Sequence, residues 1–182
     1  MEGTTKTKLY IIPVFAIALL TAIDQLSKFI ISSGYEIGQS KTVIDGVFNI
    51  TYVQNEGMAW GAFKGGRIIF IIVTVLVLIF AFYVYTRIAE EKGFLFFRIL
   101  LIFFISGSVG NLIDRASKGY VVDFFNFCLI NFPVFNVADV YLTVSLILMA
   151  ITVVFFFDDE KFDKAFSFKK KQETKDEIRS RC

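Results

Sequence analysis

Histidine is absent from this chain of 182 residues, and cysteine and proline each occur only twice. The lack of histidine excludes Ser-His and Cys-His nucleophile pairs, HExxH zinc sites and an imidazole general base. The two cysteines, Cys128 and Cys182, are too few for a four-thiolate metal site or a disulfide framework. What remains is apolar: 55% of the residues are hydrophobic, the mean hydropathy is +0.64, and Phe occurs 23 times. This composition is too apolar for an ordinary soluble domain, and the length allows one domain.

Four long apolar segments predict four membrane-spanning helices. They cover residues 9–31, 68–86, 94–113 and 137–157. Each is close to the roughly 20 residues that a helix needs to cross a bilayer core, and a helix satisfies its own backbone groups inside lipid. We interpret the first segment as a retained helix and not a cleaved signal peptide. Its apolar run continues into Asp24 and Lys28 without a small-residue cleavage site.

The distribution of basic residues predicts how the chain is oriented. Four spans place both termini on one side, and that side carries 13 of the 19 Lys and Arg, whereas the loops 32–67 and 114–136 carry 5. The positive-inside rule therefore predicts cytoplasmic termini and outward loops. We expect residues 1–157 to form a four-helix transmembrane domain and residues 158–182 to form a charged, solvated cytoplasmic tail.

The outward loops contain two further elements. Thr42–Val53 is rich in β-branched and aromatic residues around Asp45-Gly46, which predicts a small hairpin or sheet at the membrane surface. Met58–Phe63 contains the only Trp and is typical of an interfacial helix or loop. An apolar outer surface of this kind suits a substrate that is itself embedded in the membrane.

Charged groups at membrane depth are costly and indicate pairing or function. Asp24 and Lys28 are four residues apart on one helix face, and they form either an internal ion pair or two groups that reach interfacial water. Asn111 and Arg115 are also four apart at the end of the third span. They either point together at a ligand or serve packing and capping, since Ser106 and Gly110 nearby make a small-xxx-small pair that permits close helix contact.

The acids Asp123 and Asp139 are the most informative pair. Asp139 follows Asn136, a possible N-cap, and an acid in the first turn of a helix is favoured by the helix dipole alone. Asp123 stands in the apolar string VVDFF, where neither its flanks nor its spacing supply a partner. The intervening residues can bring both carboxylates together near the outer surface. Spacing alone leaves open whether this pair is catalytic or structural.

Two adjacent carboxylates in an apolar site have a specific chemistry. They do not both ionise cheaply, so the pair holds one proton. The ionised group can take a proton from a water molecule while the protonated group hydrogen-bonds the scissile carbonyl, and return of a proton to the amine breaks the C–N bond. This hydrolysis needs neither histidine nor a metal, and the shared proton belongs to the pair.

Five sequence blocks, in order, resemble those of lipoprotein signal peptidase, the type II signal peptidase of bacteria. They are DQLSK at 24–28, NEGMAWG at 55–61, GNLIDR at 110–115, VVDF at 121–124 and FNVAD at 135–139. The resemblance covers nearly the whole chain up to the tail. It implies an all-α membrane protein of four transmembrane helices with a small extracytoplasmic β-cradle and a short interfacial helix. One departure is Ser106-Gly107, where the family usually has paired glycines.

The resemblance also implies the function and the site. The expected enzyme is an aspartic endopeptidase of the bacterial plasma membrane, with its active site near the outer face. It would cleave a diacylglyceryl-modified prolipoprotein immediately N-terminal to the lipidated cysteine. The catalytic dyad maps onto Asp123 and Asp139. Residues at positions that bind substrate or support the dyad are Asn55, Gly57, Asn111, Asp114, Arg115, Asn136, Ala138, Asp24 and Lys28.

Other readings make different predictions. A small transporter or channel component would spread its charges through the membrane depth, but the second span has none. A non-catalytic scaffold would tolerate Asp123→Asn. A Ser-Lys peptidase is disfavoured because Ser27 and Lys28 are adjacent on a helix and diverge by about 100°. We expect no cofactor, no metal and no nucleic acid, a monomer in contact with membrane lipid, and Cys128 as a packed residue.

Overall fold

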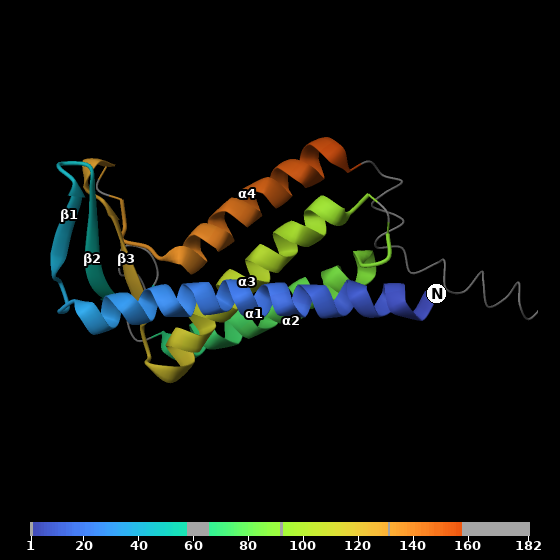
Figure 1. The fold of residues 1–182 in the computed structure, drawn as a ribbon, viewed down its shortest axis with the longest axis horizontal. Helices are drawn as coiled ribbons and strands as arrows, with labels where there is room; N and C mark the ends of the chain where they lie inside the picture. Colours follow the sequence, from blue (N-terminus) through green and yellow to red (C-terminus); the bar gives the residue numbers. More distant parts are fainter. Residues whose placement is uncertain (1, 58–65, 92, 131, 158–182) are drawn as a thin grey trace, which may run out of the picture.

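The computed structural model describes residues 2–57, 66–91, 93–130 and 132–157, and within these ranges it contains four long helices and one small sheet. The helices lie alongside one another and the sheet lies at one end of them (Figure 1). Their bounds are α1 Glu2–Gly34, α2 Arg67–Ile88, α3 Leu95–Ser117 and α4 Val137–Phe156. All four are long and apolar enough to cross a membrane, which confirms the predicted spans. Helix α3 extends to Ser117, four residues beyond the predicted apolar span, and Asp114 and Arg115 lie near its C-terminal end, as the sequence predicts.

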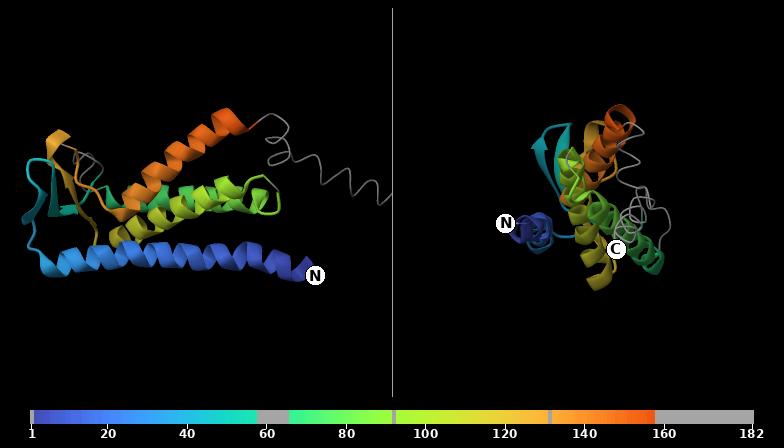
Figure 2. Two further views of the ribbon diagram at one scale, coloured as in Figure 1. Left: turned by 45° about the horizontal axis from the view of Figure 1, so that its top comes forward. Right: turned by 90° about the vertical axis from the view of Figure 1, so that its right-hand side faces the viewer.

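Helix α3 is the centre of the bundle, because α1, α2 and α4 each pack against it (Figure 2). Gly107 and Gly110 permit this close packing, and the prediction from the small-xxx-small pair Ser106 and Gly110 is confirmed at Gly110. A Cβ atom at Gly107 would lie 2.5 Å from the backbone oxygen of Ala138, and one at Gly110 would collide with the carboxylate of Asp24. The two glycines therefore let α4 and α1 approach α3 at the depth of the polar site.

Helix α1 also contacts α2, through a hydrogen bond at the end of the bundle away from the sheet. Pro13 lies inside α1 and has no N–H, so the carbonyl of Leu9, four residues earlier, lacks its helical donor. The hydroxyl of Tyr85 donates to that carbonyl at 2.9 Å. Tyr85 is buried in the apolar core that α2, α3 and α4 form at this end. The outward sides of the helices carry exposed apolar residues such as Phe80 and Phe155, as expected for contact with lipid.

The sheet has three antiparallel strands in the order β1-β2-β3. They are β1 Ser40–Ile44, β2 Phe48–Asn55 and β3 Val121–Phe127. Strands β1 and β2 confirm the predicted hairpin, and Gly46 adopts a positive φ of 67° in its turn. Strand β3 is not predicted from its own residues. It pairs Val121 with Asn55 and Asp123 with Val53, which anchors one acid beside the end of β2.

Three further predictions concern Met58–Phe63, the tail 158–182 and Cys128. Met58–Phe63 and the tail 158–182 lie outside the described residues. The prediction for Cys128 is wrong: this residue begins the short 3-10 helix η2, Cys128–Ile130, and is exposed. Its sulfur accepts a hydrogen bond from Asn49 at 3.0 Å. The lack of a partner cysteine or histidine argues against a disulfide or a nucleophile, but it does not indicate whether Cys128 faces the core.

Candidate active site

Asn136 joins the two acids that the sequence singles out. Its side-chain amide donates to Asp123 Oδ1 at 2.6 Å. Its side-chain oxygen accepts from the backbone N–H of Asp139 at 3.0 Å, and its own backbone N–H donates to Asp139 Oδ2 at 3.1 Å. These last two bonds form a capping box at the start of α4. Asn136, the N-cap of α4, thus binds both Asp123 of strand β3 and Asp139 of helix α4.

Two more asparagines complete the hydrogen bonding of the acids. Asn55, at the end of β2, donates to Asp123 Oδ2 at 2.8 Å, and Asn111 of α3 donates to Asp139 Oδ1 at 2.7 Å. The side-chain oxygen of Asn55 accepts from the backbone N–H of Gly57 at 3.0 Å, which directs its amide toward Asp123. Each carboxylate oxygen of the pair therefore has one fixed N–H donor. The remaining lone pairs are available to water or substrate.

Burial decides the proton affinity of Asp123, which is 1% exposed. Desolvation, with the nearby negative charge of Asp139, raises the pKa of Asp123 to about 7. The hydrogen bonds from Asn55 and Asn136 and the positive charge of Lys28 act in the opposite direction. A carboxyl with this pKa holds its proton for part of the time at neutral pH, as a shared-proton pair requires.

A buried ionic cluster lies behind the acids. The ammonium of Lys28 contacts Asp24 Oδ2 at 2.9 Å and Asp114 Oδ2 at 3.1 Å, and all three side chains are fully buried. Asp24 Oδ1 accepts from the backbone N–H of Ala138 at 2.9 Å, so α1 supplies a cap for α4. Asp114 is also bonded by Lys118 at 3.0 Å and by the backbone N–H of Val122 at 3.3 Å. The cluster ties α1, α3, α4 and β3 together.

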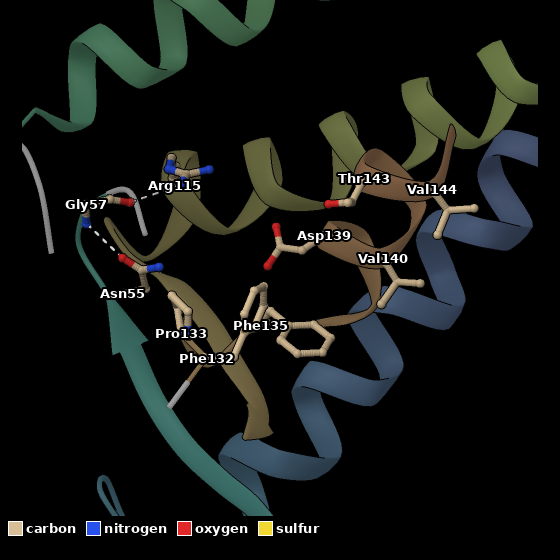
Figure 3. A pocket seen from close by; sticks show the side chains of 10 residues that line it. All are labelled: Asn55, Gly57, Arg115, Phe132, Pro133, Phe135, Asp139, Val140, Thr143 and Val144. Atoms are coloured by element: carbon tan, nitrogen blue, oxygen red, sulfur yellow. Dashed lines mark hydrogen bonds between the residues drawn. The ribbon is translucent and has the colours of Figure 1, made fainter. Parts of the chain in front are cut away.

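A pocket of about 540 Å³ opens beside Asp139 (Figure 3). Its lining has a polar end at the sheet and an apolar end along α4. The lining residues are Asn55, Gly57, Arg115, Phe132, Pro133, Phe135, Asp139, Val140, Thr143 and Val144. Val140, Val144 and Phe132 are also exposed, so the apolar end faces the region where lipid would lie. An elongated molecule with a polar part and an apolar part fits this lining.

Arg115 lies at the polar end of the pocket. Its guanidinium donates to the backbone oxygen of Gly57 at 3.4 Å and lies 5.3 Å from the centre of the Phe70 ring. The backbone oxygens of Arg115 and Ala116 in turn accept hydrogen bonds from Arg67 at 2.8 and 2.7 Å. Arg67 thereby satisfies two carbonyls at the C-terminus of α3 and steadies the residue that carries the guanidinium.

The structure brings most of the predicted residues together and decides between alternatives that the sequence left open. Asp24 and Lys28 form the internal ion pair, one of the two alternatives left open. Asn111 bonds to Asp139, and Arg115 donates to Gly57 and lines the pocket. Ser27 donates to the Asp24 backbone oxygen and not to Lys28, which removes the Ser-Lys reading.

Sequence reasoning did not single out Thr143, which lines the pocket one helical turn after Asp139. Its i+4 spacing from Asp139 is the sequence signal that could have identified Thr143.

Within the described ranges, no three acidic or cysteine side chains gather as metal ligands. The polar side chains that line the pocket are those of Asn55, Arg115, Asp139 and Thr143.

Comparisons with known proteins agree with this arrangement. The family model for signal peptidase (SPase) II matches residues 16–155. The chain belongs to the signal peptidase II family. It is a peptidase and a multi-pass bacterial membrane protein. The blocks that carry the resemblance lie inside the matched range and supply the acids, their asparagine partners and the ionic cluster.

The family assignment is supported by relatives and by solved structures. The lipoprotein signal peptidase of Clostridioides difficile (strain 630) is 42% identical over 144 residues, which cover 79% of this chain and 95% of the relative. That of Enterococcus faecalis is 35% identical, covering 87% of this chain and 95% of the relative. A solved bacterial membrane enzyme at 31% identity covers 88% of this chain and 94% of its own, with a TM-score of 0.72.

Proposed function

We propose that this protein is an aspartic endopeptidase that removes the signal peptide from bacterial prolipoproteins carrying diacylglycerol on a cysteine. Cleavage occurs immediately N-terminal to that cysteine. The catalytic groups are Asp123 and Asp139. The sheet end of the bundle, where both acids lie, faces the outside of the plasma membrane, and both termini are cytoplasmic.

One observation carries this proposal: Asn136 bonds to both acids, at 2.6 Å to Asp123 and through the capping box to Asp139. If Asp139 served only to cap α4, Asn136 would have no need to bind a second carboxylate, that of Asp123. Asp123 is buried, Asp139 is partly buried, and the charge of Asp139 raises the pKa of Asp123. Keeping two acids this close is costly, and a site that bears this cost is typical of a shared-proton dyad.

The chemistry follows from one proton on two carboxyl groups. The ionised carboxylate takes a proton from water, whose oxygen forms a bond to the scissile carbonyl carbon, while the protonated carboxyl donates to the carbonyl oxygen. A tetrahedral diol results. A proton then passes to the amide nitrogen and the C–N bond breaks. The products are a carboxylic acid on the signal peptide and a free amine on the lipidated cysteine, and the dyad again holds one proton.

The pocket supports the choice of substrate. Asn55, Gly57 and Arg115 at its polar end offer donors and acceptors to a peptide backbone. The apolar side chains of Val140 and Val144 follow along α4 toward lipid, where acyl chains would lie. A lipid-modified cysteine presents both kinds of surface within a few bonds of the scissile amide. An unmodified precursor would leave the apolar end in contact only with water or bulk lipid.

The test is cleavage of a diacylglyceryl-modified prolipoprotein by the purified full-length protein in lipid or detergent. Asp123→Asn and Asp139→Asn are each expected to lower the rate by at least 1,000-fold (about 4 kcal/mol of transition-state stabilisation), while the proteins remain folded. Asp45→Asn is the matched control, because Asp45 is an exposed acid in the β1–β2 turn. Normal cleavage by either dyad variant contradicts the proposal. Equal cleavage of unmodified precursor contradicts the assignment of a lipidated substrate.

A further inference from the structure

Lys28 has contacts that an ordinary buried ion pair does not require. Its ammonium reaches three acceptors: Asp24 Oδ2 at 2.9 Å, Asp114 Oδ2 at 3.1 Å and Asn111 Oδ1 at 2.9 Å. An ammonium has three N–H donors, so these acceptors account for all of them. Its side chain is fully buried and does not line the pocket. Lys28 therefore has no proton to offer the substrate and no direct route to it.

The third acceptor gives Lys28 an influence on the acids. Asn111 lies between Lys28 and Asp139, with one end of its amide toward each. Because an ammonium only donates, the atom of Asn111 that faces Lys28 must be the carbonyl oxygen. The NH₂ group is then directed at Asp139 Oδ1, 2.7 Å away. The reversed amide would oppose NH₂ to an ammonium and oxygen to a carboxylate, which is unfavourable at both ends.

Lys28 and Asp139 bind opposite ends of the Asn111 amide, and among the described residues Lys28 is the closer of the two donors to its oxygen. Asn136 also donates to Asn111 Oδ1, but at 3.3 Å, while the same amide nitrogen bonds to Asp123 at 2.6 Å. Lys28 is itself held because Asp24 is bonded to the Ala138 backbone and Asp114 to Lys118. The ionic cluster of Asp24, Lys28 and Asp114, which contacts α1, α3, α4 and β3, thus sets the orientation of the Asn111 amide.

We propose that Lys28 is a positioning residue for the hydrolysis: it fixes the side-chain amide of Asn111 so that its NH₂ group holds Asp139 in place. This inference rests on the proposed function of the dyad. Lys28 acts through Asn111 and touches neither the substrate nor the reacting atoms. The ionic cluster therefore has a catalytic consequence in addition to its contribution to folding.

The first test is a double-mutant cycle on kcat, normalised to folded protein, with Lys28→Met, Asn111→Ala and both together. Lys28→Met should lower kcat by roughly 10- to 100-fold, as loss of an outer-shell partner does in metal sites, and leave KM unchanged because Lys28 is outside the pocket. Added to Asn111→Ala, it should cost no more than about a further twofold, since the group it orients is already gone. The same loss in both backgrounds overturns the proposal.

Lys28→Gln provides the matched variant. It removes the charge, as Met does, but keeps an N–H donor for Asn111 Oδ1. We expect it to recover part of the kcat that Lys28→Met loses. Equal kcat in the Met and Gln proteins would mean that only the charge matters, and the positioning role would be wrong.

A second measurement does not depend on how the Lys28 variants fold or on residual turnover. In protein labelled with ¹⁵N at asparagine and with Lys28 intact, NMR should give one side-chain ¹⁵N resonance for Asn111, with the two proton peaks of one NH₂ group, assigned by its loss in Asn111→Ala. That resonance should move when Asp139→Asn removes the acceptor of the NH₂ group. Two exchanging ¹⁵N resonances for Asn111, or one resonance that does not move in Asp139→Asn, overturn the proposal. Failure of the proposed function is a separate result: Asp123→Asn and Asp139→Asn would then cleave normally, whatever Lys28 does.

Discussion

The side-chain amide of Asn136 donates to the carboxylate of Asp123 at 2.6 Å, so the N-cap of α4 is also a ligand of the strand acid. Capping and acid pairing depend on different atoms of one side chain. The carbonyl oxygen caps the helix and the NH₂ group holds Asp123. Substitutions that keep one atom and remove the other can therefore separate stability from catalysis.

Asn136→Ala is expected to remove both the helix cap and the hydrogen bond to Asp123. The missing cap should cost about 1 kcal/mol of stability, and cleavage should fall sharply because Asp123 loses a donor. Asn136→Ser keeps an oxygen for the Asp139 backbone N–H but has no amide for Asp123. We expect Ser to restore thermal stability in detergent without restoring cleavage. A Ser variant as active as wild type would mean that the amide of Asn136 has no catalytic role.

The pH dependence of cleavage should follow the raised pKa of Asp123. A carboxyl whose pKa rises to about 7 keeps its proton below that pH and loses it above, so the dyad loses its shared proton and kcat falls as pH increases past 7. Asn55→Ala removes a hydrogen bond that favours the ionised form, which raises the pKa further. The midpoint of the fall should then move to higher pH. A rate that stays constant well above pH 7, or a midpoint that moves down, contradicts this assignment.

The contact between Tyr85 and Leu9 should matter only while Pro13 is present. In wild type, Tyr85→Phe leaves the Leu9 carbonyl without a donor, at a cost of about 1–3 kcal/mol. In a Pro13→Ala background the alanine N–H can bond to that carbonyl, so the same substitution should cost less. Thermal unfolding of the four proteins in detergent measures the coupling. Equal costs in both backgrounds would show that the hydroxyl does not compensate for Pro13.

The apolar end of the pocket should determine how lipid-modified substrate binds. Val144→Trp places a large ring in the cavity and should raise KM roughly tenfold, which corresponds to about 1.4 kcal/mol of lost binding. Leu146→Trp is the matched control, since Leu146 is similarly exposed on α4 but does not line the pocket. Kinetics with the lipidated substrate compare the two. If both variants raise KM equally, the effect comes from the membrane surface of α4 and not from the pocket.

Long-range partners explain what sequence reasoning left open. Asp123 appears alone in VVDFF, but its donors are Asn55, 68 residues earlier, and Asn136, 13 residues later. Strand β3 follows the same rule, because it forms by pairing with β2 across the intervening helices. The exposure of Cys128 also depends on tertiary structure, because the sequence does not indicate which side of the turn after β3 faces outward.

The sequence by itself determined the four spans and the hairpin, and it indicates the carboxylate chemistry that we propose. A run of about 20 apolar residues must be helical in lipid because its backbone has no other partners. A chain without histidine is left with its few acids at membrane depth for proton transfer. Only the tertiary structure decided which groups meet: the asparagine donors of each acid, the lysine behind Asn111 and the pocket along α4. These contacts join residues far apart in the chain, and they exist only once α1, α3, α4 and the sheet have packed together.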